Sequence, residues 1–440
     1  MLVPVDVQSL LKTLNDAGFS AYAVGGCVRD SLLGRTPSDW DICTSATPEE
    51  MKAIFREERL VETGLKHGTL TVVRNHIPYE ITTFREDGNY ADHRHPDTVS
   101  FVRELSGDLA RRDFTINAMA CASDGQVIDL YQGREDLSRG VIRCVGTPSQ
   151  RFEEDALRIL RALRFASTMD FLVDPDTEQA VRLHYPELTH VAAERIRVEL
   201  FKLLCGPGAG RVLRSYTEVF AFLIPALAPS VDYHQQNPHH RYTVWEHTIR
   251  GLEGVPPDLA LRLTMLFHDT GKPYTRTTDE NGIGHYRGHP AVSAQLAHQS
   301  LLDLRCDRQL MDRVVRLVEA HDIPLSTDRK LLLHRLNKFG ERDLRALFQI
   351  HQADRIATGT RNPDHARKHC VELNAALDQL LSEQPCYSLR DLAVNGDDLK
   401  ELGYAGKEIG ATLNRLLEAV MNGDLPNEKE ALLDSLRVHD

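Results

Sequence analysis

The chain has 440 residues, of which 42% are hydrophobic, so it is long enough for about two to four domains with buried cores. Its formal net charge of −12 excludes a uniformly basic coat, so a nucleic-acid partner would have to be held by local basic patches. The eight cysteines are scattered and form no Cys-x-x-Cys pair, which argues against a disulfide framework or a zinc knuckle and predicts a cytoplasmic protein. The most apolar stretch, residues 219–228, is too short to cross a bilayer, which argues against a membrane partner.

Hydrophobic periodicity divides the chain into a mixed first part and a helical second part. Residues 5–17 have helical spacing, and short β-rich runs with intervening turns follow, as in residues 69–73, 79–83 and 126–130. We therefore expect an α/β domain with a mixed sheet. After Phe152 the pattern is helical to the end, which predicts an α+β protein overall. Pro, Gly or Asn clusters break this helical part near 206–210, 229–241, 273–290, 323–327, 361–364, 385–388 and 422–427.

A glycine pair and two aspartates form the first motif that carries chemistry. Gly25 and Gly26 stand between a short apolar strand and a helix, where a backbone without Cβ can approach a ligand and helix-start amides favour an anion. Asp39 and Asp41 would point to one side of a strand. Two carboxylates on one face suit a pair of Mg²⁺ ions, with nucleotide phosphates completing the coordination. Each piece alone is more often a turn or a solvated loop, but the combination predicts a nucleotide site.

Two nearby features extend this site. Residues 79–85 alternate like a strand, so Glu80 can bring a third carboxylate that positions or deprotonates an attacking hydroxyl. An exposed strand glutamate is the alternative. The polar segment 86–96, which contains Arg94, predicts a mobile loop that acts as a lid, with an ordinary linker as the alternative.

Residues 111–118 supply further groups for a nucleotide. Arg112 and Asn117 can hydrogen-bond a triphosphate or a ribose, and Asp113 can orient them. Taken alone, the segment would be a helix with surface charge.

The helix expected from residue 152 carries a candidate base-reading pair. Asp155 and Arg158 are three residues apart and would share a face, and Arg161 follows. A carboxylate accepts from an exocyclic amine and a guanidinium donates to ring acceptors, which matches cytosine and adenine and opposes uracil and guanine. A surface ion pair is the alternative.

Five motifs stand in order along the first half of the chain and together carry a resemblance. They are residues 24–30, 39–41, 111–118, 154–158 and 194–200. In this order they resemble the class II CCA-adding enzymes, which are tRNA nucleotidyltransferases, and their bacterial poly(A) polymerase relatives. The resemblance implies a polymerase-β-like catalytic head, a neck that reads the incoming base, and a helical body and tail for tRNA. The expected boundaries are 1–145 for the head, 146–230 for the neck, 231–365 for the body and 366–440 for the tail.

The resemblance also assigns roles to individual residues. It implies that Asp39 and Asp41 bind catalytic Mg²⁺, that Glu80 is the third acid, and that Asp155 and Arg158 select CTP and then ATP. The loop with Arg94 resembles the flexible loop of enzymes that add all three nucleotides, which argues against an enzyme limited to CC. The implied nucleotide-binding residues are Gly25, Gly26, Arg29, Arg112, Asp113, Asn117, Asp155, Arg158 and Arg161, and the implied neck-supporting residues are Glu194 and Arg197.

A second set of candidate ligands lies in the helical half. Two imidazoles and two carboxylates suit a divalent transition metal. Each histidine alone is more often structural, but the set resembles the HD phosphohydrolase superfamily over about residues 240–360, a domain fused behind the head in some CCA-adding enzymes. This implies metal-assisted hydrolysis of a phosphate or cyclic phosphate at damaged tRNA ends, or a docking scaffold. The ligands are His247, His268, Asp269 and Asp354, with His289 and His321 available for a second metal.

The resemblance predicts an enzyme that joins CMP, CMP and AMP to a tRNA 3′ end and releases pyrophosphate. Its partners are tRNA, CTP and ATP, with two Mg²⁺ ions as cofactors and no obligate protein partner. The nearest alternative is a poly(A) polymerase or an A-adding tRNA nucleotidyltransferase on the same head. The others are a metal-dependent phosphohydrolase whose head binds RNA, and a non-catalytic tRNA-binding factor.

Overall fold

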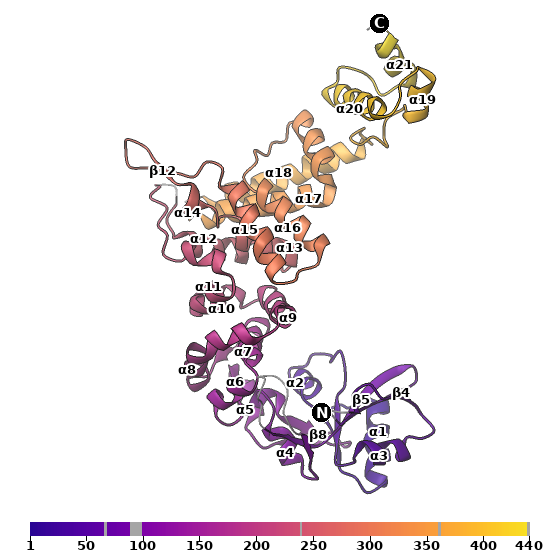
Figure 1. Ribbon diagram of the computed structural model, residues 1–440, viewed down its shortest axis with the longest axis vertical. Helices are drawn as coiled ribbons and strands as arrows, with labels where there is room; N and C mark the ends of the chain where they lie inside the picture. Colours follow the sequence, from indigo (N-terminus) through magenta and orange to yellow (C-terminus); the bar gives the residue numbers. More distant parts are fainter. Residues whose placement is uncertain (66–67, 89–98, 238–239, 360–361, 438–440) are drawn as a thin grey trace. The chain divides into compact units, whose positions relative to one another are not determined.

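A computed structural model describes residues 1–65, 68–88, 99–237, 240–359 and 362–437, so Arg94 lies outside the described residues. The chain separates into two compact units (Figure 1). The expected α+β fold is confirmed, with the sheet in the first unit and a helical second unit. Within the described ranges, no helix is both long and apolar enough to cross a membrane. The first unit comprises Met1–Pro225 with Asp303–Cys306, and the second comprises Ala226–Leu302 with Asp307–Asp440.

A mixed sheet forms the base of the first unit. Among the described residues it has seven strands in the order β3-β4-β5-β2-β1-β8-β9. Only β2 and β5 run parallel within it, so residues that precede β2 lie beside residues within β5. The strands are β1 Ala21–Val24, β2 Ile42–Thr44, β3 Arg59–Val61, β4 Thr69–Arg74, β5 Ile77–Thr83, β8 Met119–Cys121 and β9 Val127–Asp129. Shorter described pairs are β6 Arg85–Asp87 with β7 Val99–Phe101, and β10 Val141–Ile142 with β11 Leu172–Val173.

Helices cover the two faces of this sheet. Helix α1 (Val5–Asp16) packs against β1 and α3 (Pro48–Ile54), and α3 contacts β4 (Figure 1). Thr47 and Glu50 close a capping box at the start of α3. Val24 belongs to a buried cluster that includes Leu109 of α4 (Leu105–Ala110). The apolar residues of β1 therefore pack on both faces, which holds the Gly25 turn at its end rigidly.

The remaining helices of the first unit follow the sheet. The sequence pattern predicts one helix from residue 152, but the structure ends α6 at Glu154 and starts α7 at Leu157. Asp155 has extended backbone angles, φ −147° and ψ 101°, and its side chain accepts a hydrogen bond from the Leu157 amide. This local bond competes with helix continuation, so the expected continuous helix is wrong. The elements are α2 Gly26–Leu32, η2 Thr115–Asn117, α5 Gly133–Arg139, α6 Pro148–Glu154, α7 Leu157–Thr168, α8 Pro175–His184, η3 Tyr185–His190, α9 Ala193–Leu204, α10 Ala209–Ser215 and α11 Thr217–Leu223.

The second unit is built around a long helix, α17, which packs against α12, α13, α16 and α18. Gly340 interrupts α17 with φ 72° and ψ 165°, a conformation open essentially to glycine alone. The small hairpin β12 Thr277–Thr278 with β13 Gly284–His285 follows α14. The helical elements are η4 Pro225–Ser230, α12 Val244–Gly254, α13 Leu259–Phe267, α14 Lys272–Thr275, α15 His289–Asp303, α16 Arg308–Ala320, α17 Arg329–Ala357, α18 Pro363–Ser382, α19 Gly396–Glu401, α20 Lys407–Asn422 and α21 Lys429–Arg437.

Candidate active site and metal centre

The turn between β1 and α2 brings backbone and guanidinium together. Gly25 has φ 82° and ψ −129°, and its amide donates to the Met119 carbonyl at 3.2 Å. A Cβ at Gly25 would lie 3.0 Å from Nη1 of Arg112. The position therefore requires glycine both for its backbone angles and for this close approach.

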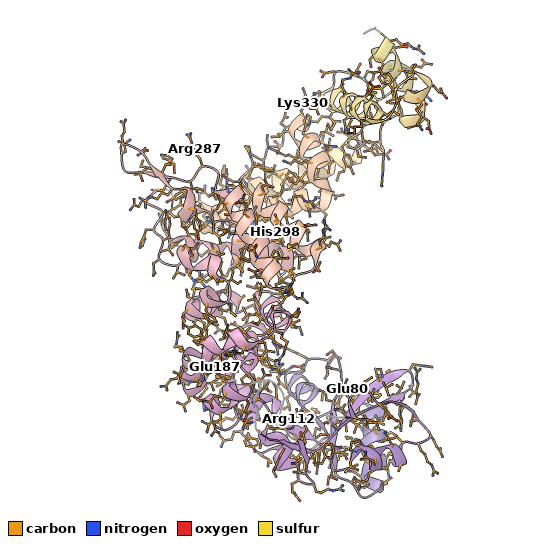
Figure 2. The ribbon with its side chains drawn as sticks, viewed as in Figure 1. Glu80, Arg112, Glu187, Arg287, His298 and Lys330 are labelled. Carbon is orange, nitrogen blue, oxygen red and sulfur yellow. The ribbon has the colours of Figure 1, made fainter. Side chains whose placement is uncertain are left out.

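Three carboxylates converge beside this turn. The sequence pattern placed Asp39 and Asp41 within a strand, but β2 begins at Ile42, so both precede it. The Asp41 carbonyl accepts from the Val24 amide at 2.9 Å, and the parallel register of Ile42 with Ile81 brings Asp41 beside Glu80. Figure 2 labels Glu80 in this head.

The electrostatics of these acids suit a cation. The pKa of the Asp41 carboxyl is raised, first by the desolvation that neighbouring protein atoms cause and then by the charges of Asp39 and Glu80, whereas Arg112 opposes the shift. Asp41 is nevertheless exposed, so a cation can reach its carboxylate. Asp39 is exposed and accepts from the Ser38 hydroxyl at 2.7 Å. A set of oxygen donors whose negative charges destabilise one another fits Mg²⁺.

A buried aspartate that the sequence pattern did not single out positions Arg112. Asp108 of α4 is fully buried and pairs with Arg111 at 2.8 Å and with Arg112 at 3.0 Å. Burial raises the pKa of Asp108, but the two guanidinium groups overcome that effect and leave its pKa below the ordinary value. The i,i+3 and i,i+4 spacing from Asp108 to two arginines is the signal that would have identified it.

Four predicted residues form one chain of polar contacts. Arg29 Nη1 donates to Asn117 Oδ1 at 2.6 Å, and Asn117 Nδ2 donates to Asp113 Oδ1 at 3.0 Å. Arg161 of α7 donates to Asp113 Oδ2 at 2.6 Å. Burial opposes ionisation of Asp113, but the charge of Arg161 and the Asn117 hydrogen bond lower its pKa to about 2. Asp113 thus connects the head to α7 within the first unit.

An aromatic ring lies at the end of this chain. The Phe165 centroid lies 5.0 Å from the guanidinium carbon of Arg29, 5.6 Å from that of Arg161 and 3.7 Å from that of Arg164. Glu199 of α9 pairs with Arg164 and lies 3.7 Å from Arg161. Phe165 was not predicted, because an apolar residue on a helix is indistinguishable from ordinary core in a sequence.

The candidate base-reading residues do not lie in one helix. Asp155, in the break between α6 and α7, pairs with Arg195 of α9 at 2.8 Å. Arg158 pairs with Glu154 and donates to the Arg111 carbonyl at 3.2 Å. The expected placement of both residues within one helix is therefore wrong, because Asp155 lies outside α6 and α7, although Arg158 reaches the segment that carries Arg112.

The described ion pairs of α9 to Asp155 and α7 involve Arg195 and Glu199. The supporting role expected of Glu194 and Arg197 stays a prediction. Glu194 is exposed in the first turn of α9, and Arg197 is partly buried. Arg195 and Glu199, four residues apart on one face, make the described ion pairs to Asp155 and to α7.

Two groups of side chains that could ligate a metal share one carboxylate in the second unit. His247 Nε2 lies 2.8 Å from Asp354 Oδ1 and 3.2 Å from Asp269 Oδ2, and 3.1 Å from His268 Nε2. The ligand atoms of these four residues all lie within 4.8 Å of one another. The helices α12, α13 and α17 bring them together. This is the set that the sequence predicts.

The second group lies on the other oxygen of the same aspartate. His289 Nε2 is 3.2 Å from Asp269 Oδ1 and 3.2 Å from His321 Nε2. His321 Nε2 is 3.8 Å from Asp269 Oδ1. Asp269 therefore presents one oxygen to each group, and its Oδ2 also pairs with the buried Lys272 ammonium at 2.6 Å.

Backbone carbonyls fix the histidine rings. Nδ1 lies 2.7 Å from the Met265 carbonyl in His268, 2.8 Å from the Tyr286 carbonyl in His289 and 2.7 Å from the Val318 carbonyl in His321. A carbonyl only accepts, so Nδ1 of these three rings carries a proton, and each ring, when neutral, presents its Nε2 lone pair to the cluster. The Nε2 atoms of His247 and His268 lie 3.1 Å apart, and those of His289 and His321 lie 3.2 Å apart. A buried set of facing nitrogen and oxygen donors fits a divalent transition metal.

The head, with its glycine turn, its converging acids and its mixed sheet, defines a polymerase-type nucleotidyltransferase. Residues 21–143 match the family model of the poly A polymerase head domain, residues 170–230 that of the probable RNA and SrmB-binding site of polymerase A, and residues 291–436 that of tRNA nucleotidyltransferase domain 2.

Whole-chain relatives identify the family. The CCA-adding enzyme of Lactiplantibacillus plantarum is 34% identical over 452 residues, covering 99% of this chain and 97% of its own. The crystal structure of the Bacillus stearothermophilus CCA-adding enzyme in complex with CTP is 31% identical in sequence, with a TM-score of 0.72. The match covers 100% of this chain and 99% of that chain. The Thermotoga maritima CCA-adding enzyme complexed with tRNA shares the fold, with 23% identity and a TM-score of 0.57. The match covers 100% of this chain and 97% of that chain. The chain belongs to the CCA-adding enzymes and is a nucleotidyltransferase.

Proposed function

We propose that the protein adds C, C and A in turn to the 3′ end of tRNA, using CTP and ATP without a nucleic-acid template. The observation that carries the proposal is the convergence of Asp39, Asp41 and Glu80 beside the Gly25 turn. The whole-length similarity to CCA-adding enzymes supports the choice of substrates. Such an enzyme acts in the cytoplasm and needs no protein partner.

The chemistry follows from the acids. The terminal 3′-hydroxyl oxygen of tRNA attacks the α-phosphorus of the nucleotide, and the bond to the β-phosphate breaks to release pyrophosphate. Asp39 and Asp41 would hold two Mg²⁺ ions, which supply charge stabilisation for the attacking and leaving oxygens. Glu80 positions the hydroxyl or accepts its proton. Desolvation raises the pKa of Asp41 most, and the charges of Asp39 and Glu80 raise it further, so the nearness of these two charges supports the assignment.

The nucleotide is held by the polar chain beside the acids. Arg112, placed by Asp108, and Arg29, placed by Asn117, offer guanidinium groups to the triphosphate. Gly25 and Gly26 let the backbone approach the phosphates, and Asn117 contacts the ribose. Asp113 orients Asn117 and anchors Arg161.

Asp155 and Arg158 choose the base. The Asp155 carboxylate accepts from the exocyclic amine of cytosine or adenine, and Arg158 donates to the adjacent ring acceptor. The proximity of Arg158 to Arg111 supports their action near the same nucleotide. We propose residues 146–230 as the neck that carries this pair, 231–365 as the body and 366–440 as the tail that binds tRNA.

A poly(A) polymerase or an A-adding enzyme would share this head. Labelled CTP and ATP supplied to tRNA that lacks its CCA end separate the alternatives, because such an enzyme would incorporate ATP alone. A phosphohydrolase whose head only binds RNA would lose its activity in His268→Ala and keep it in Asp39→Ala. A non-catalytic factor would bind tRNA and incorporate neither nucleotide.

The cluster around Asp269 supports a second function, metal-dependent hydrolysis of a phosphate or cyclic phosphate at tRNA ends, as in HD phosphohydrolases. His247, His268, Asp269 and Asp354 would hold one divalent transition metal, and His289 and His321 a second. The metal would polarise the phosphate and activate water. Two substrates test this activity, tRNA ending in a 2′,3′-cyclic phosphate, which would be opened to a terminal monophosphate, and tRNA ending in a monophosphate, which would release inorganic phosphate. Both reactions should be lost in His268→Ala, and metal-loaded protein that catalyses neither would leave the cluster a structural site.

A further inference from the structure

We infer that Arg195 is a positioning residue that orients the Asp155 carboxylate and thereby sets the preference for CTP and ATP over UTP and GTP. The inference rests on the proposed base-reading role of Asp155. The resemblance to the family assigned the supporting role in residues 194–200 to Glu194 and Arg197. The ion pair to Asp155 is made by Arg195, which lies between them.

Both oxygens of Asp155 are held by different elements. Arg195 Nη2 lies 2.8 Å from Oδ2, and the Leu157 amide donates to Oδ1 at 3.1 Å. An ionised carboxylate has about four lone-pair sites, so roughly two stay open for a base. Two fixed contacts determine the plane of the carboxylate, and with it the direction of the open lone pairs.

The backbone at Asp155 cannot supply this orientation by itself. Asp155 lies outside α6 and α7 with an extended conformation, so it lacks the rotamer restriction of a helix interior. Its side chain is 16% exposed and that of Arg195 is 26% exposed, which leaves both reachable by a nucleotide. The guanidinium of Arg195 is the charged group that restricts the Asp155 side chain.

Helix α9 in turn holds Arg195 in place. Glu199, one turn further along the same face, pairs with Arg164 and lies near Arg161 of α7. Ile196, Leu200 and Leu203 are buried along α9, which packs on α7. The base-reading carboxylate is therefore connected through α9 to the arginines that surround Phe165.

Selectivity depends on the orientation of the Asp155 carboxylate because a hydrogen bond to the correct base requires an open lone pair that points at the amine of that base. Cytosine and adenine present an amine that must meet an open lone pair, whereas uracil and guanine present a carbonyl that gains nothing from any orientation. A carboxylate free to rotate loses affinity for the correct bases and little for the wrong ones. The ratio of correct to incorrect incorporation falls as a result.

The experiment compares Arg195→Gln and Arg195→Lys with Lys202→Gln, which removes an exposed cation from the same helix. The kcat/KM for CTP, UTP, ATP and GTP is measured on tRNA ending before the CCA and after CC. Arg195→Gln is expected to raise the UTP-to-CTP and GTP-to-ATP ratios about tenfold, within the range of discrimination that one bidentate base contact supplies. Arg195→Lys keeps the charge without the planar fork and is expected to recover part of the preference. Lys202→Gln is expected to keep the wild-type ratios.

Two outcomes separate this inference from the proposed function. If Asp155→Ala loses selectivity while both Arg195 variants keep the wild-type ratios, or if they slow all four nucleotides equally, Arg195 has only a structural role and the inference is overturned. If wild-type protein does not discriminate among the nucleotides, the base-reading role of Asp155 fails first. Arg195→Lys supplies the same comparison if Arg195→Gln does not fold.

Discussion

Asp113 and Arg161 form an ion pair with a separation of 2.6 Å, and this pair joins the catalytic head to helix α7 of the first unit. Asp113 also accepts from Asn117, which accepts from Arg29. The groups proposed to hold the nucleotide and the helix that carries Arg158 are therefore parts of one polar network. A change at Asp113 should affect both stability and nucleotide binding.

Asp113→Asn is expected to lower the free energy of unfolding at pH 7 by about 2 kcal/mol, which corresponds to the lowering of the Asp113 pKa from 3.8 to about 2. Because the folded-state pKa is depressed, this stabilisation is present above the unfolded-state pKa and disappears as pH falls from about 4 towards 2. Urea denaturation across that pH range measures it.

The matched control is Asp16→Asn, which removes an exposed pair with Lys12 and should change stability by less than about 0.5 kcal/mol. An equal effect of the two variants at pH 7 would contradict the role given to Asp113.

Gly25→Ala is expected to raise KM for CTP and ATP on the order of tenfold, because a Cβ 3.0 Å from Arg112 Nη1 would displace that guanidinium. Positive φ also costs the variant roughly 1–3 kcal/mol of stability. Steady-state kinetics and thermal denaturation measure the two effects.

Gly18→Ala separates steric from backbone effects. Gly18 has φ 88°, and no heavy atom lies within 4 Å of the position that a Cβ would occupy, so it carries the backbone strain without the contact. It should lose similar stability and keep the wild-type KM. A raised KM in both variants would show that backbone strain alone explains the Gly25 result.

His247→Ala is expected to abolish binding of a divalent transition metal at the His247 cluster while nucleotide addition by the head continues, since the cluster and the acids lie in different units. Metal content after loading with Mn²⁺ and desalting measures binding. His298→Ala, an exposed histidine of α15 labelled in Figure 2, is the control and should retain the metal. Wild-type protein that retains no metal would contradict the assignment.

Much of the head was predictable because its signals are local. The strands at residues 69–73 and 79–83 alternate cleanly and correspond to β4 and β5, and the apolar spacing of residues 5–17 corresponds to α1. The candidate histidine and aspartate ligands of the second unit were predicted as a set, and their side chains lie together in the structure.

The remaining features depend on contacts that no local pattern records. No proline or glycine marks the break at Asp155, which forms because its side chain bonds the Leu157 amide and because Arg195 reaches it from α9. The spacing of Asp108 to Arg111 and Arg112 is visible in the sequence, but its complete burial beside them is visible only in the structure. Phe165 resembles core until three guanidinium groups surround it.

The most direct test of the central claim is nucleotide addition by wild-type protein and Asp41→Asn on three tRNA substrates, ending before the CCA, after C and after CC. With CTP, ATP and Mg²⁺, the wild type is expected to complete all three ends. Asp41→Asn is expected to lose roughly a thousandfold in rate with its fold intact, because a metal ligand contributes several kcal/mol of charge stabilisation. A wild-type protein that leaves CC-ending tRNA unextended with ATP, or an Asp41→Asn variant as active as the wild type, would contradict the account.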